Sequence, residues 1–426
     1  MKVFFDIVGC RLNQSEAENL ANSFRALGHQ IVGDAAQADI AIINTCAVTT
    51  KAAADSRKKL RRASRLGAKQ VIATGCWATL YPKRALKLEG VTKVYPNLKK
   101  DEIVADILHI SPDLISSEDL IRVPLPGERA RTRAFIKVQE GCNHHCTYCL
   151  TRVARGKSQS RSINEIRRDI HSAVVGGAKE IVLTGVQLGS WGRDFDKSLR
   201  LKDLLINVLN LDGFDRLRLS SIEPWDFDEN MINLWQDNRL CRHLHIPLQS
   251  GDDRILKAMA RPITNDSYRA LIENIRSSIP NIAITTDVIV GFPGETEDAF
   301  SNTKLLIQSL AFAGGHVFTF SPRPGTVANE MPNQIDSFIA KARNAELRKM
   351  FTKSGFDFRD HFIDEQLPVL WESATRESKD IWQLSGLTDN YIRVFSTAKA
   401  NLWNTITPVL LEDHHPKGKG LMGVIR

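Results

Sequence analysis

The sequence predicts an α/β protein with an N-terminal parallel α/β domain, a central partial (β/α)6 barrel and a small C-terminal antiparallel β-barrel. Up to about residue 354, short apolar runs alternate with amphipathic helical patterns, which is typical of parallel sheets. From about residue 355, short strand-like runs are separated by polar turns, which favours a small β-barrel. The chain of 426 residues is also too long for one ordinary core.

The first predicted domain covers residues 1–107. Its expected strands are 2–9, 38–46 and 69–76, and its expected helices are 15–28 and 51–67. Each strand ends at or beside a cysteine: Cys10, Cys46 and Cys76. Ligands bind at the carboxyl edge of open parallel sheets, so these cysteines could share a metal site. From the residues alone, burial of three small apolar side chains is the competing interpretation.

Residues 108–130 are rich in Ser, Pro and charge, and we expect a linker there. The second domain, 128–354, has six expected strands: 133–139, 179–185, 216–221, 243–248, 283–291 and 314–320. Six strand–helix units favour a partial barrel, whose chemistry belongs at the C-terminal strand ends. The third domain, 355–426, has expected strands at 367–373, 390–397, 405–414 and 421–426.

The strongest motif follows the first barrel strand. Cys142, Cys146 and Cys149 have C-x3-C-x2-C spacing. Three thiolates in one loop can each bind one iron of a 4Fe-4S cluster and leave the fourth iron open. The alternative is a zinc knuckle with His144 or His145 as fourth ligand, but the spacing and the position after a strand favour the cluster.

This motif, with Tyr148 before its last cysteine, resembles the signature of radical S-adenosylmethionine (SAM) enzymes. The resemblance implies that the open iron binds S-adenosyl-L-methionine, which is cleaved to a 5′-deoxyadenosyl radical. The strings GCRLNQSEAE, NTCAVT and TGCWAT resemble the N-terminal domain of the methylthiotransferases. That likeness implies a second 4Fe-4S cluster on Cys10, Cys46 and Cys76, whose open iron carries the donated sulfur.

Further strings, among them ARGKSQSR, RLRLSSIEP, HLHIPLQSGDDRILKAM and TTDVIVGFPGE, resemble the methylthiotransferases that act on N6-threonylcarbamoyladenosine beside the anticodon. The resemblance implies a TRAM-like RNA-binding barrel at the C-terminus and a two-stage reaction. One SAM methylates sulfur at the first cluster; a second yields the radical that takes hydrogen from carbon 2 of the adenine. We nominate no catalytic residue beyond the cluster ligands. The implied partners are the tRNA anticodon stem-loop, an external electron donor and a sulfur source.

Polar residues and glycines near the barrel strand ends are candidates to bind the cofactor, because a ligand pocket needs a few polar groups and close backbone approach. With Tyr148 from the cysteine motif, the candidates are Gln187, Ser221, Glu223, Gln249 and Gly291. Each of them could equally support its neighbours without touching the cofactor.

Basic residues form two candidate RNA contacts. The first group, close after the cysteine loop, is Arg152, Arg155, Lys157 and Arg161, and the second includes Arg61 and Arg62 on a basic helix. The formal net charge of +8 suits a polyanionic partner. A solvated face is the alternative for both groups.

The N-terminus lacks the apolar stretch of a signal peptide, and no apolar run reaches membrane-spanning length. We therefore expect a cytoplasmic protein that makes no membrane contact, and by default we take it to be a monomer. Cys241 has no cysteine nearby, which favours burial beside a barrel strand. The competing functions are methylthiolation of isopentenyladenosine tRNA or of a ribosomal-protein aspartate, a radical enzyme whose second cluster relays electrons, and a non-catalytic metal-containing RNA-binding protein.

Overall fold

The computed structural model describes residues 1–111, 121–123, 125, 132–196 and 198–426. It divides into two compact units, which are described separately: the first holds residues 1–144, 150–187 and 191–199, and the second holds 145–149, 188–190 and 200–426. Most of the linker predicted at 108–130 lies outside the described residues.

The N-terminal part of the first unit is a parallel five-stranded sheet in the order β2-β1-β3-β4-β5. Its strands are β1 (Lys2–Ile7), β2 (Gln30–Val32), β3 (Ile40–Thr45), β4 (Gln70–Gly75) and β5 (Val91–Tyr95). The three predicted strands are confirmed as neighbours at the centre of the sheet. The edge strands β2 and β5 were not predicted, because they are short and lack a clear apolar pattern.

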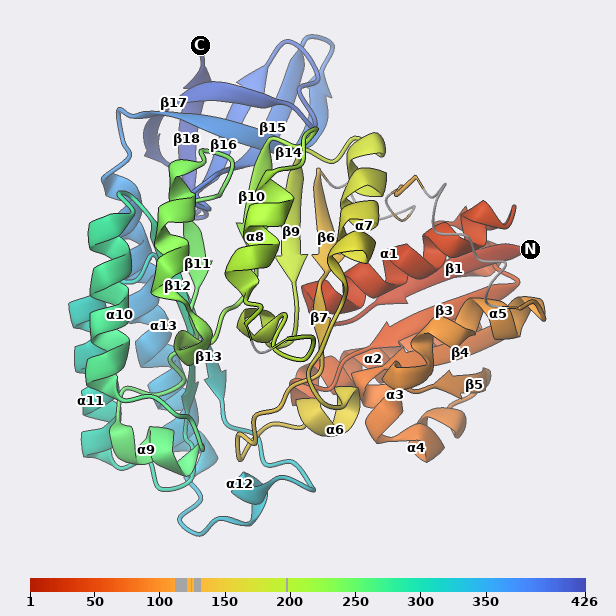
Figure 1. Cartoon of the computed structure of the whole chain (residues 1–426), viewed down its shortest axis with the longest axis horizontal. Helices are drawn as coiled ribbons and strands as arrows, with labels where there is room; N and C mark the ends of the chain where they lie inside the picture. The colour runs from red at the N-terminus through yellow and green to blue at the C-terminus, as the bar shows by residue number, and fades with distance from the viewer. Residues whose placement is uncertain (112–120, 124, 126–131, 197) are drawn as a thin grey trace. The chain divides into compact units, whose positions relative to one another are not determined.

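Helices connect or follow these strands (Figure 1). They are α1 (Arg11–Ala26), α2 (Thr50–Arg65), α3 (Cys76–Leu80), α4 (Pro82–Leu86) and α5 (Ile103–Leu108). The α2 helix begins where the Thr49 hydroxyl accepts a hydrogen bond from the Ala52 N–H, a capping contact that satisfies one free donor of the first turn. The α1 helix begins directly after Cys10.

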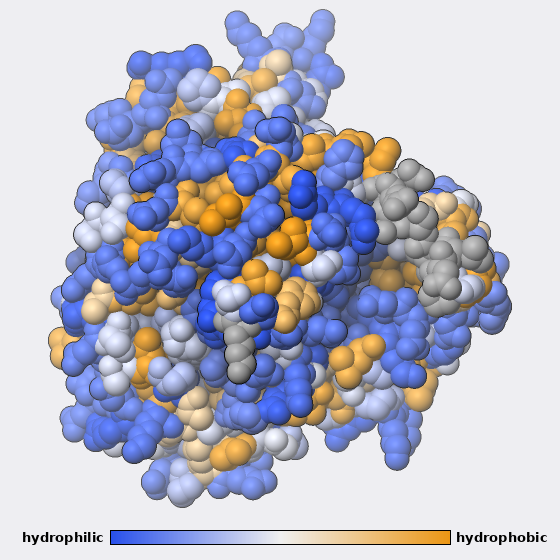
Figure 2. All heavy atoms as spheres, in the orientation of Figure 1, coloured by the Kyte–Doolittle hydropathy of each residue, from blue (hydrophilic) through white to orange (hydrophobic). Residues whose placement is uncertain are grey.

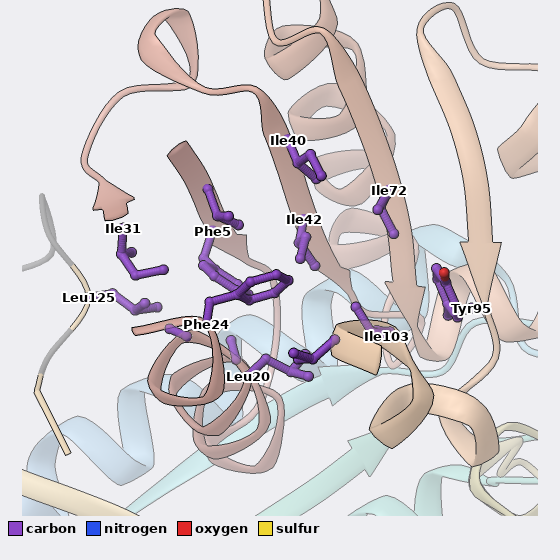
Figure 3. Close-up of a cluster of buried hydrophobic side chains, with 14 residues drawn as sticks. Phe5, Leu20, Phe24, Ile31, Ile40, Ile42, Ile72, Tyr95, Ile103 and Leu125 are labelled. Carbon is purple, nitrogen blue, oxygen red and sulfur yellow. The ribbon is translucent and has the colours of Figure 1, made fainter. Parts of the chain in front are cut away.

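A buried hydrophobic cluster holds α1 against the sheet (Figure 3). Phe24 of α1 is fully buried and lies near Phe5 of β1, with ring centroids 6.2 Å apart. Ile42 and Ile72 extend the cluster along β3 and β4. Burying each such side chain contributes about 1.5–3 kcal/mol, so this packing fixes the start of α1 at the carboxyl edge of the sheet.

The first unit also contains the parallel pair β6 (Arg133–Lys137) and β9 (Glu180–Thr184), connected through α7 (Ile163–Val175). A capping box between Ser162 and Glu165 begins α7. A short antiparallel pair, β7 (Gln139–Glu140) and β8 (Gln159–Ser160), flanks α6 (Thr151–Arg155).

The second unit contains the remaining predicted barrel strands: β10 (Arg216–Leu219), β11 (His243–His245), β12 (Ala283–Val290) and β13 (Gly314–Thr319). The strands β11, β12 and β13 are parallel neighbours. Their helices are α8 (Leu201–Leu209), α9 (Asp253–Ala258), α10 (Asn265–Ser278), α11 (Glu297–Leu310), α12 (Val327–Glu330) and α13 (Ser337–Asp360). Figure 1 shows α10, α11 and α13 on one side of these strands. Because successive side chains of a strand point to opposite faces, every second side chain faces these helices. The predicted alternation of six strands with helices is confirmed.

The chain ends in a closed five-stranded barrel of order β14-β15-β16-β18-β17. Its strands are β14 (Gln366–Ser378), β15 (Ile381–Thr388), β16 (Arg393–Ala398), β17 (Ile406–His414) and β18 (Leu421–Ile425). All neighbours are antiparallel except β16 and β18, which are parallel. The predicted barrel is thus confirmed, although β15 was not predicted and α13 continues past residue 355 to Asp360.

Short 3-10 helices complete the described elements: Ala35–Gln37, Asn97–Glu102, Leu188–Ser190, Pro224–Asp226 and Glu229–Gln236. Within the described part of the chain, no helix is both long and apolar enough to cross a membrane. Polar residues predominate on the face drawn in Figure 2, with apolar residues scattered among them.

Candidate functional site

The three N-terminal cysteines lie together at the carboxyl edge of the sheet. Cys10 directly precedes α1, Cys46 follows β3, and Cys76 begins α3 after β4. All three are free thiols. Burial, together with the charges of the Cys10 and Cys76 thiolates, raises the pKa of the Cys46 thiol to about 11. The three thiols therefore follow the neighbouring strands β1, β3 and β4 at one edge of the sheet.

Two glycines permit this approach of the backbone. Gly9 has φ +112°, and a Cβ built on it would lie 2.8 Å from the Cys46 sulfur. Gly75 has φ +92°, and its Cβ would lie 2.3 Å from the Thr45 carbonyl oxygen. A side chain at either position would be both strained and obstructed, so glycine is required before Cys10 and before Cys76.

Hydrogen-bond donors surround the sulfur atoms. Arg155 Nε lies 3.3 Å from Cys76 Sγ, and Asn97 Nδ2 lies 3.6 Å from the same sulfur. The backbone N–H of Val48 points at Cys46 Sγ from 3.5 Å. Donors of this kind stabilise thiolates, which is the form of cysteine that binds metal.

A buried charge network supports this site. The Glu16 carboxylate accepts hydrogen bonds from Arg155 Nη1 at 2.8 Å and from Lys100 Nζ, and it lies 4.0 Å from Lys137 Nζ. Burial alone would raise the pKa of Glu16, but these three cations, Arg155 foremost, hold it well below its ordinary value. Glu16 is therefore a carboxylate in the interior of the protein. It was missed from the sequence, where only its position six residues after Cys10 could have pointed to it.

The second cysteine motif runs through both units, and its two parts are described separately. In the first unit, Cys142 Sγ lies 3.3 Å from Gln187 Oε1 and 3.4 Å from the backbone nitrogen of His144. Gln187 is buried, and its backbone N–H donates to Gln139 Oε1 at 2.8 Å. Gln187, a predicted cofactor-binding residue, is thus placed beside the first cysteine of the motif.

In the second unit, the Cys149 N–H donates to the Cys146 carbonyl at 3.0 Å, which makes a tight turn of this part of the loop. The Thr147 hydroxyl ties the turn to the Ala258 carbonyl at 2.9 Å. Tyr148 packs edge-on against Phe292, with ring centroids 6.3 Å apart, and burial raises the pKa of its phenol. Tyr148 therefore anchors the loop through an uncharged aromatic side chain.

A buried ion pair lies near this turn. Arg261 Nη2 donates to Glu223 Oε2 at 2.7 Å, and its guanidinium carbon lies 4.6 Å from the ring centroid of Trp225. The charges of Glu223 and Cys146 help to raise the pKa of Arg261 against the effect of its burial. Glu223 was predicted to bind the cofactor; its carboxylate is engaged by Arg261, a residue not predicted.

The other predicted cofactor contacts have different surroundings. Gln249 has φ +70°, and its backbone pairs with β12. Gly291 donates its N–H to Glu295 Oε2 at 2.6 Å, and a Cβ on it would lie 2.5 Å from Ala340 Cβ. The absence of a side chain at Gly291 thus permits close packing against α13. Ser221 is exposed, and its backbone pairs with that of His245 in an isolated parallel β-bridge.

His245 and Asp287 form a polar pair that the sequence did not reveal. His245 Nε2 lies 3.2 Å from Asp287 Oδ2, and His245 Nδ1 lies 2.9 Å from the Thr285 hydroxyl. Thr285 and Asp287 alternate along β12 with the fully buried Ile284 and Val288, so the pair lies on the strand face opposite the apolar one.

The basic residues predicted to contact RNA differ in how far their side chains are exposed to solvent. Arg61 and Arg62 of α2 and Lys157 are exposed, and Arg152 is half-buried. Arg161 is partly buried, and it pairs with Asp169 at 2.6 Å. Arg155 is only 3% exposed, and its guanidinium is directed at protein groups. Arg155 is therefore not presented to RNA. Cys241 is buried, as predicted.

The three thiols of the N-terminal site suit an iron–sulfur cluster better than a single metal ion. Within the described ranges, no three His, Cys, Asp or Glu side chains are arranged around a single metal ion. A cubane cluster binds its cysteines at separate iron corners, so its ligands need not converge on one point. Free thiols with N–H donors and a buried cation beside them fit an iron–sulfur cluster.

Comparison with known proteins shows what the chain is similar to. The model of the Radical SAM superfamily matches residues 136–307, and the model of Uncharacterized protein family UPF0004 matches residues 2–95. Threonylcarbamoyladenosine tRNA methylthiotransferase MtaB of Bacillus subtilis is 32% identical over 98% of this chain and 95% of its own. The tRNA-2-methylthio-N(6)-dimethylallyladenosine synthase of Clostridium tetani is 32% identical over 91% of this chain and 88% of its own.

A solved structure supports the fold alone. The radical S-adenosylmethionine methyltransferase TsrM from Kitasatospora setae superposes with a TM-score of 0.57 at 15% identity, covering 77% of this chain and 75% of that one.

Proposed function

The chain belongs to the tRNA methylthiotransferases of the radical SAM superfamily, and we propose that it adds a methylthio group to carbon 2 of N6-threonylcarbamoyladenosine beside the anticodon of tRNA. In this proposal Cys142, Cys146 and Cys149 hold the 4Fe-4S cluster that binds SAM. A second 4Fe-4S cluster is held by Cys10, Cys46 and Cys76. The enzyme works as a cytoplasmic monomer supplied with electrons and sulfur from outside.

The observation that carries the proposal is the grouping of Cys10, Cys46 and Cys76 at one sheet edge. Cysteines that were only buried apolar residues would need neither glycines that let the backbone approach them nor N–H donors at their sulfur atoms. Gly9 and Gly75 provide the first, and Arg155 provides the second. A SAM-cleaving enzyme that transfers no sulfur needs only the second motif. The additional three-thiol site is what a methylthio transfer would require.

The protein's own residues bind, orient and exclude water. When bound, the clusters and SAM supply the radical chemistry needed to replace a hydrogen on an aromatic carbon. Gln187 supports the first cysteine of the SAM motif, and Tyr148 anchors the rest of the loop. Glu223, Ser221, Gln249 and Gly291 remain proposed contacts of SAM. No side chain is required as a general base.

The substrate choice rests on the sequence strings and on the relatives. Relatives named for threonylcarbamoyladenosine are 32–35% identical to the chain, and those named for dimethylallyladenosine are 30–32% identical. The ranges overlap, so identity alone does not choose the substrate. We choose threonylcarbamoyladenosine because the strings that resemble that subgroup run from the Cys142/Cys146/Cys149 motif through the barrel.

Nucleoside mass spectrometry of tRNA from cells with and without the gene tests the choice. Loss of methylthiolated threonylcarbamoyladenosine alone supports the proposal. Loss of methylthiolated isopentenyladenosine would move the chain to the sister substrate, and no change in either would point to the ribosomal-protein aspartate.

Purified protein separates the remaining alternatives. A preparation that contains zinc, has no iron and does not cleave SAM would indicate a non-catalytic RNA-binding protein. Cleavage of SAM without a change in RNA mass would indicate that the second cluster only relays electrons.

A further inference from the structure

Two consecutive residues, Arg155 and Gly156, contact the two cysteine sites: the side chain of Arg155 contacts one site and the backbone of Gly156 contacts the other. Arg155 ends the short helix α6, which lies beside α3 (Figure 1). Its Nε points at Cys76 Sγ from 3.3 Å. The carbonyl of the next residue, Gly156, accepts a hydrogen bond from the Cys142 backbone N–H at 3.1 Å. The Arg155–Gly156 dipeptide therefore joins the first cysteine of the SAM motif to the last cysteine of the other site.

The guanidinium is held from several sides. Arg155 Nη1 donates to Glu16 Oε1 at 2.8 Å and to Glu140 Oε1 at 2.7 Å, and Nη2 donates to Asn13 Oδ1 at 2.5 Å. Glu140 stands two residues before Cys142, and Asn13 stands three residues after Cys10. The planar five-donor fork of arginine can make such contacts together, whereas lysine presents a compact point charge.

The backbone on both sides of this contact admits only glycine. Gly156 has φ +75°, and Gly141 has φ +68°. A Cβ on Gly141 would lie 1.9 Å from the Lys157 carbonyl oxygen. Asn97 adds a further tie, because its Nδ2 donates to the Ala154 carbonyl at 2.8 Å and also faces Cys76 Sγ.

The charged group beside the Cys76 sulfur is the guanidinium of Arg155. The buried or half-buried groups here are two carboxylates, Glu16 and Glu140, and three cations, Arg155, Lys100 and Lys137. Both carboxylates contact the Nη1 side of Arg155, while Nε faces Cys76. A cationic N–H donor to a ligand sulfur withdraws electron density and raises the reduction potential of the cluster.

We propose that Arg155 is a positioning residue of the Cys10/Cys46/Cys76 cluster, which donates a charged N–H to Cys76 and fixes that site relative to Cys142. This inference rests on the proposed second cluster and deepens it. It replaces the predicted RNA contact of Arg155 with a role inside the protein.

The test starts from the full chain carrying Cys142→Ala, Cys146→Ala and Cys149→Ala, in which only the first three cysteines remain to hold a cluster. Iron and sulfide per chain and the EPR signal of the reduced protein are measured first. A parent that binds no cluster shows the proposed second cluster to be wrong, and the role of Arg155 falls with it. A parent that binds one establishes the cluster independently of Arg155.

In that parent, the midpoint potential is measured by EPR-monitored redox titration. We expect Arg155→Gln to shift it to more negative values and Arg155→Lys to shift it less, because lysine keeps the charge and loses the fork. Arg167→Gln, which removes one exposed charge on α7, is expected to cause no shift. An unchanged potential in Arg155→Gln with iron fully retained would overturn the proposal.

A second variant covers a failure to fold. Arg155→Gln combined with Glu140→Gln removes the guanidinium and one carboxylate that it pairs with, while Glu16 keeps Lys100 and Lys137 as partners, so no buried charge is left unpaired. The same negative shift is expected there. In the enzyme with both cysteine motifs intact, Arg155→Lys is expected to lower methylthiolated product more than 5′-deoxyadenosine, since SAM cleavage depends on the other motif. Equal loss of the two products would contradict a role of Arg155 at the Cys10/Cys46/Cys76 site in particular.

Discussion

Glu16 and Arg155 form an ion pair with 2.8 Å between Oε1 and Nη1, although 139 residues separate them and both side chains are only 2% exposed. Lys100, also almost completely buried, donates to the same carboxylate. Two charged groups removed from water are stable only while each is paired. The stability of the buried charges in the first unit therefore depends on the Glu16 carboxylate, which is the common partner of Arg155 and Lys100.

Replacing Glu16 should destabilise the protein strongly. In Glu16→Gln, Lys100 loses the carboxylate with which it pairs and Arg155 keeps only Glu140, and breaking a buried pair in this way costs about 3–5 kcal/mol. Urea unfolding followed by circular dichroism measures the change in the transition of the first unit. The control is Glu89→Gln, since Glu89 is exposed, and surface changes stay within about 0.5 kcal/mol. Equal midpoints for the two variants would contradict the prediction.

The two cysteine motifs should fail differently. We expect Cys142→Ala to abolish 5′-deoxyadenosine production, because the cluster that binds SAM loses a ligand. Cys46→Ala should leave some cleavage while methylthiolation stops. Chromatography of deoxyadenosine and mass spectrometry of the RNA nucleosides measure both products in one reaction. Cys241→Ala is the matched control, because Cys241 is a buried cysteine that is distant in sequence from both motifs. Equal loss of cleavage in both motif variants would argue against separate roles.

Acid should weaken the contacts that hold the turn between β15 and β16 against Arg242. Arg242 makes two hydrogen bonds to Asp389, 2.6 Å from Nε to Oδ2 and 3.1 Å from Nη2 to Oδ1. Arg218 and Arg216 donate to carbonyl oxygens of Asp389 and Leu387, both at 2.8 Å. Burial would raise the pKa of Asp389, but the hydrogen bonds and charge of Arg242 lower it. These contacts join the C-terminal barrel to β10 and the start of β11.

The sign of the pH dependence follows from that lowered pKa. An aspartate whose pKa is lower when folded stabilises the protein above its unfolded pKa of about 3.9, and this contribution is lost as the pH falls through the folded value. At pH 7, Asp389→Asn should cost about 1.5–3 kcal/mol, the range for hydrogen bonds to charged groups. The difference from the parent should shrink below about pH 4. Tryptophan fluorescence during urea unfolding measures it, with the exposed Asp380→Asn as control. A difference independent of pH would contradict the assignment.

Most of the fold was predictable because most of its strands and helices carry a regular pattern of apolar residues. KVFFDI, IAIINT and QVIATG each contain a continuous apolar run of three or four residues, as is typical of strands in a parallel sheet covered on both faces. The edge strands β2 and β5 have only partial burial, so their composition carries less signal. In β15 the run IWQLSGLT mixes polar residues and a glycine into the strand, which concealed it.

The site was predictable only where one residue type carries the chemistry. Cysteines at strand ends stand out in a sequence, and the structure places Cys10, Cys46 and Cys76 as expected. The partners of Arg155 come from distant segments, so no local pattern connects Glu16 with it. Within ARGKSQSR, Arg155 looks like any exposed basic residue, yet α6 buries it while Lys157 stays exposed. Burial of a charged group depends on tertiary contacts, which spacing does not encode.

Arg61 and Arg62 should contribute to RNA binding without affecting the chemistry. The α2 helix begins at Thr50, close after Cys46, and the two arginines lie in its later turns. At about 1.5 Å per residue, Arg61 lies roughly 16 Å along the helix from its start. Both side chains are exposed, so they can reach phosphates distant from the modified base. They are therefore expected to change affinity and leave the rate at saturation unchanged.

The double variant Arg61→Gln/Arg62→Gln tests this through salt dependence. Each phosphate contact contributes about 0.7 to the slope of log K against log salt for single strands and about 0.9 for duplex, so losing two should lower the slope by roughly 1.4–1.8. Binding of an anticodon stem-loop is measured at several salt concentrations, alongside single-turnover methylthiolation at saturating RNA. The control Lys349→Gln/Lys353→Gln removes two exposed charges from α13. An equal fall in slope for the control would indicate a diffuse effect of net charge, and a slower rate at saturation would show that the arginines act on the chemistry.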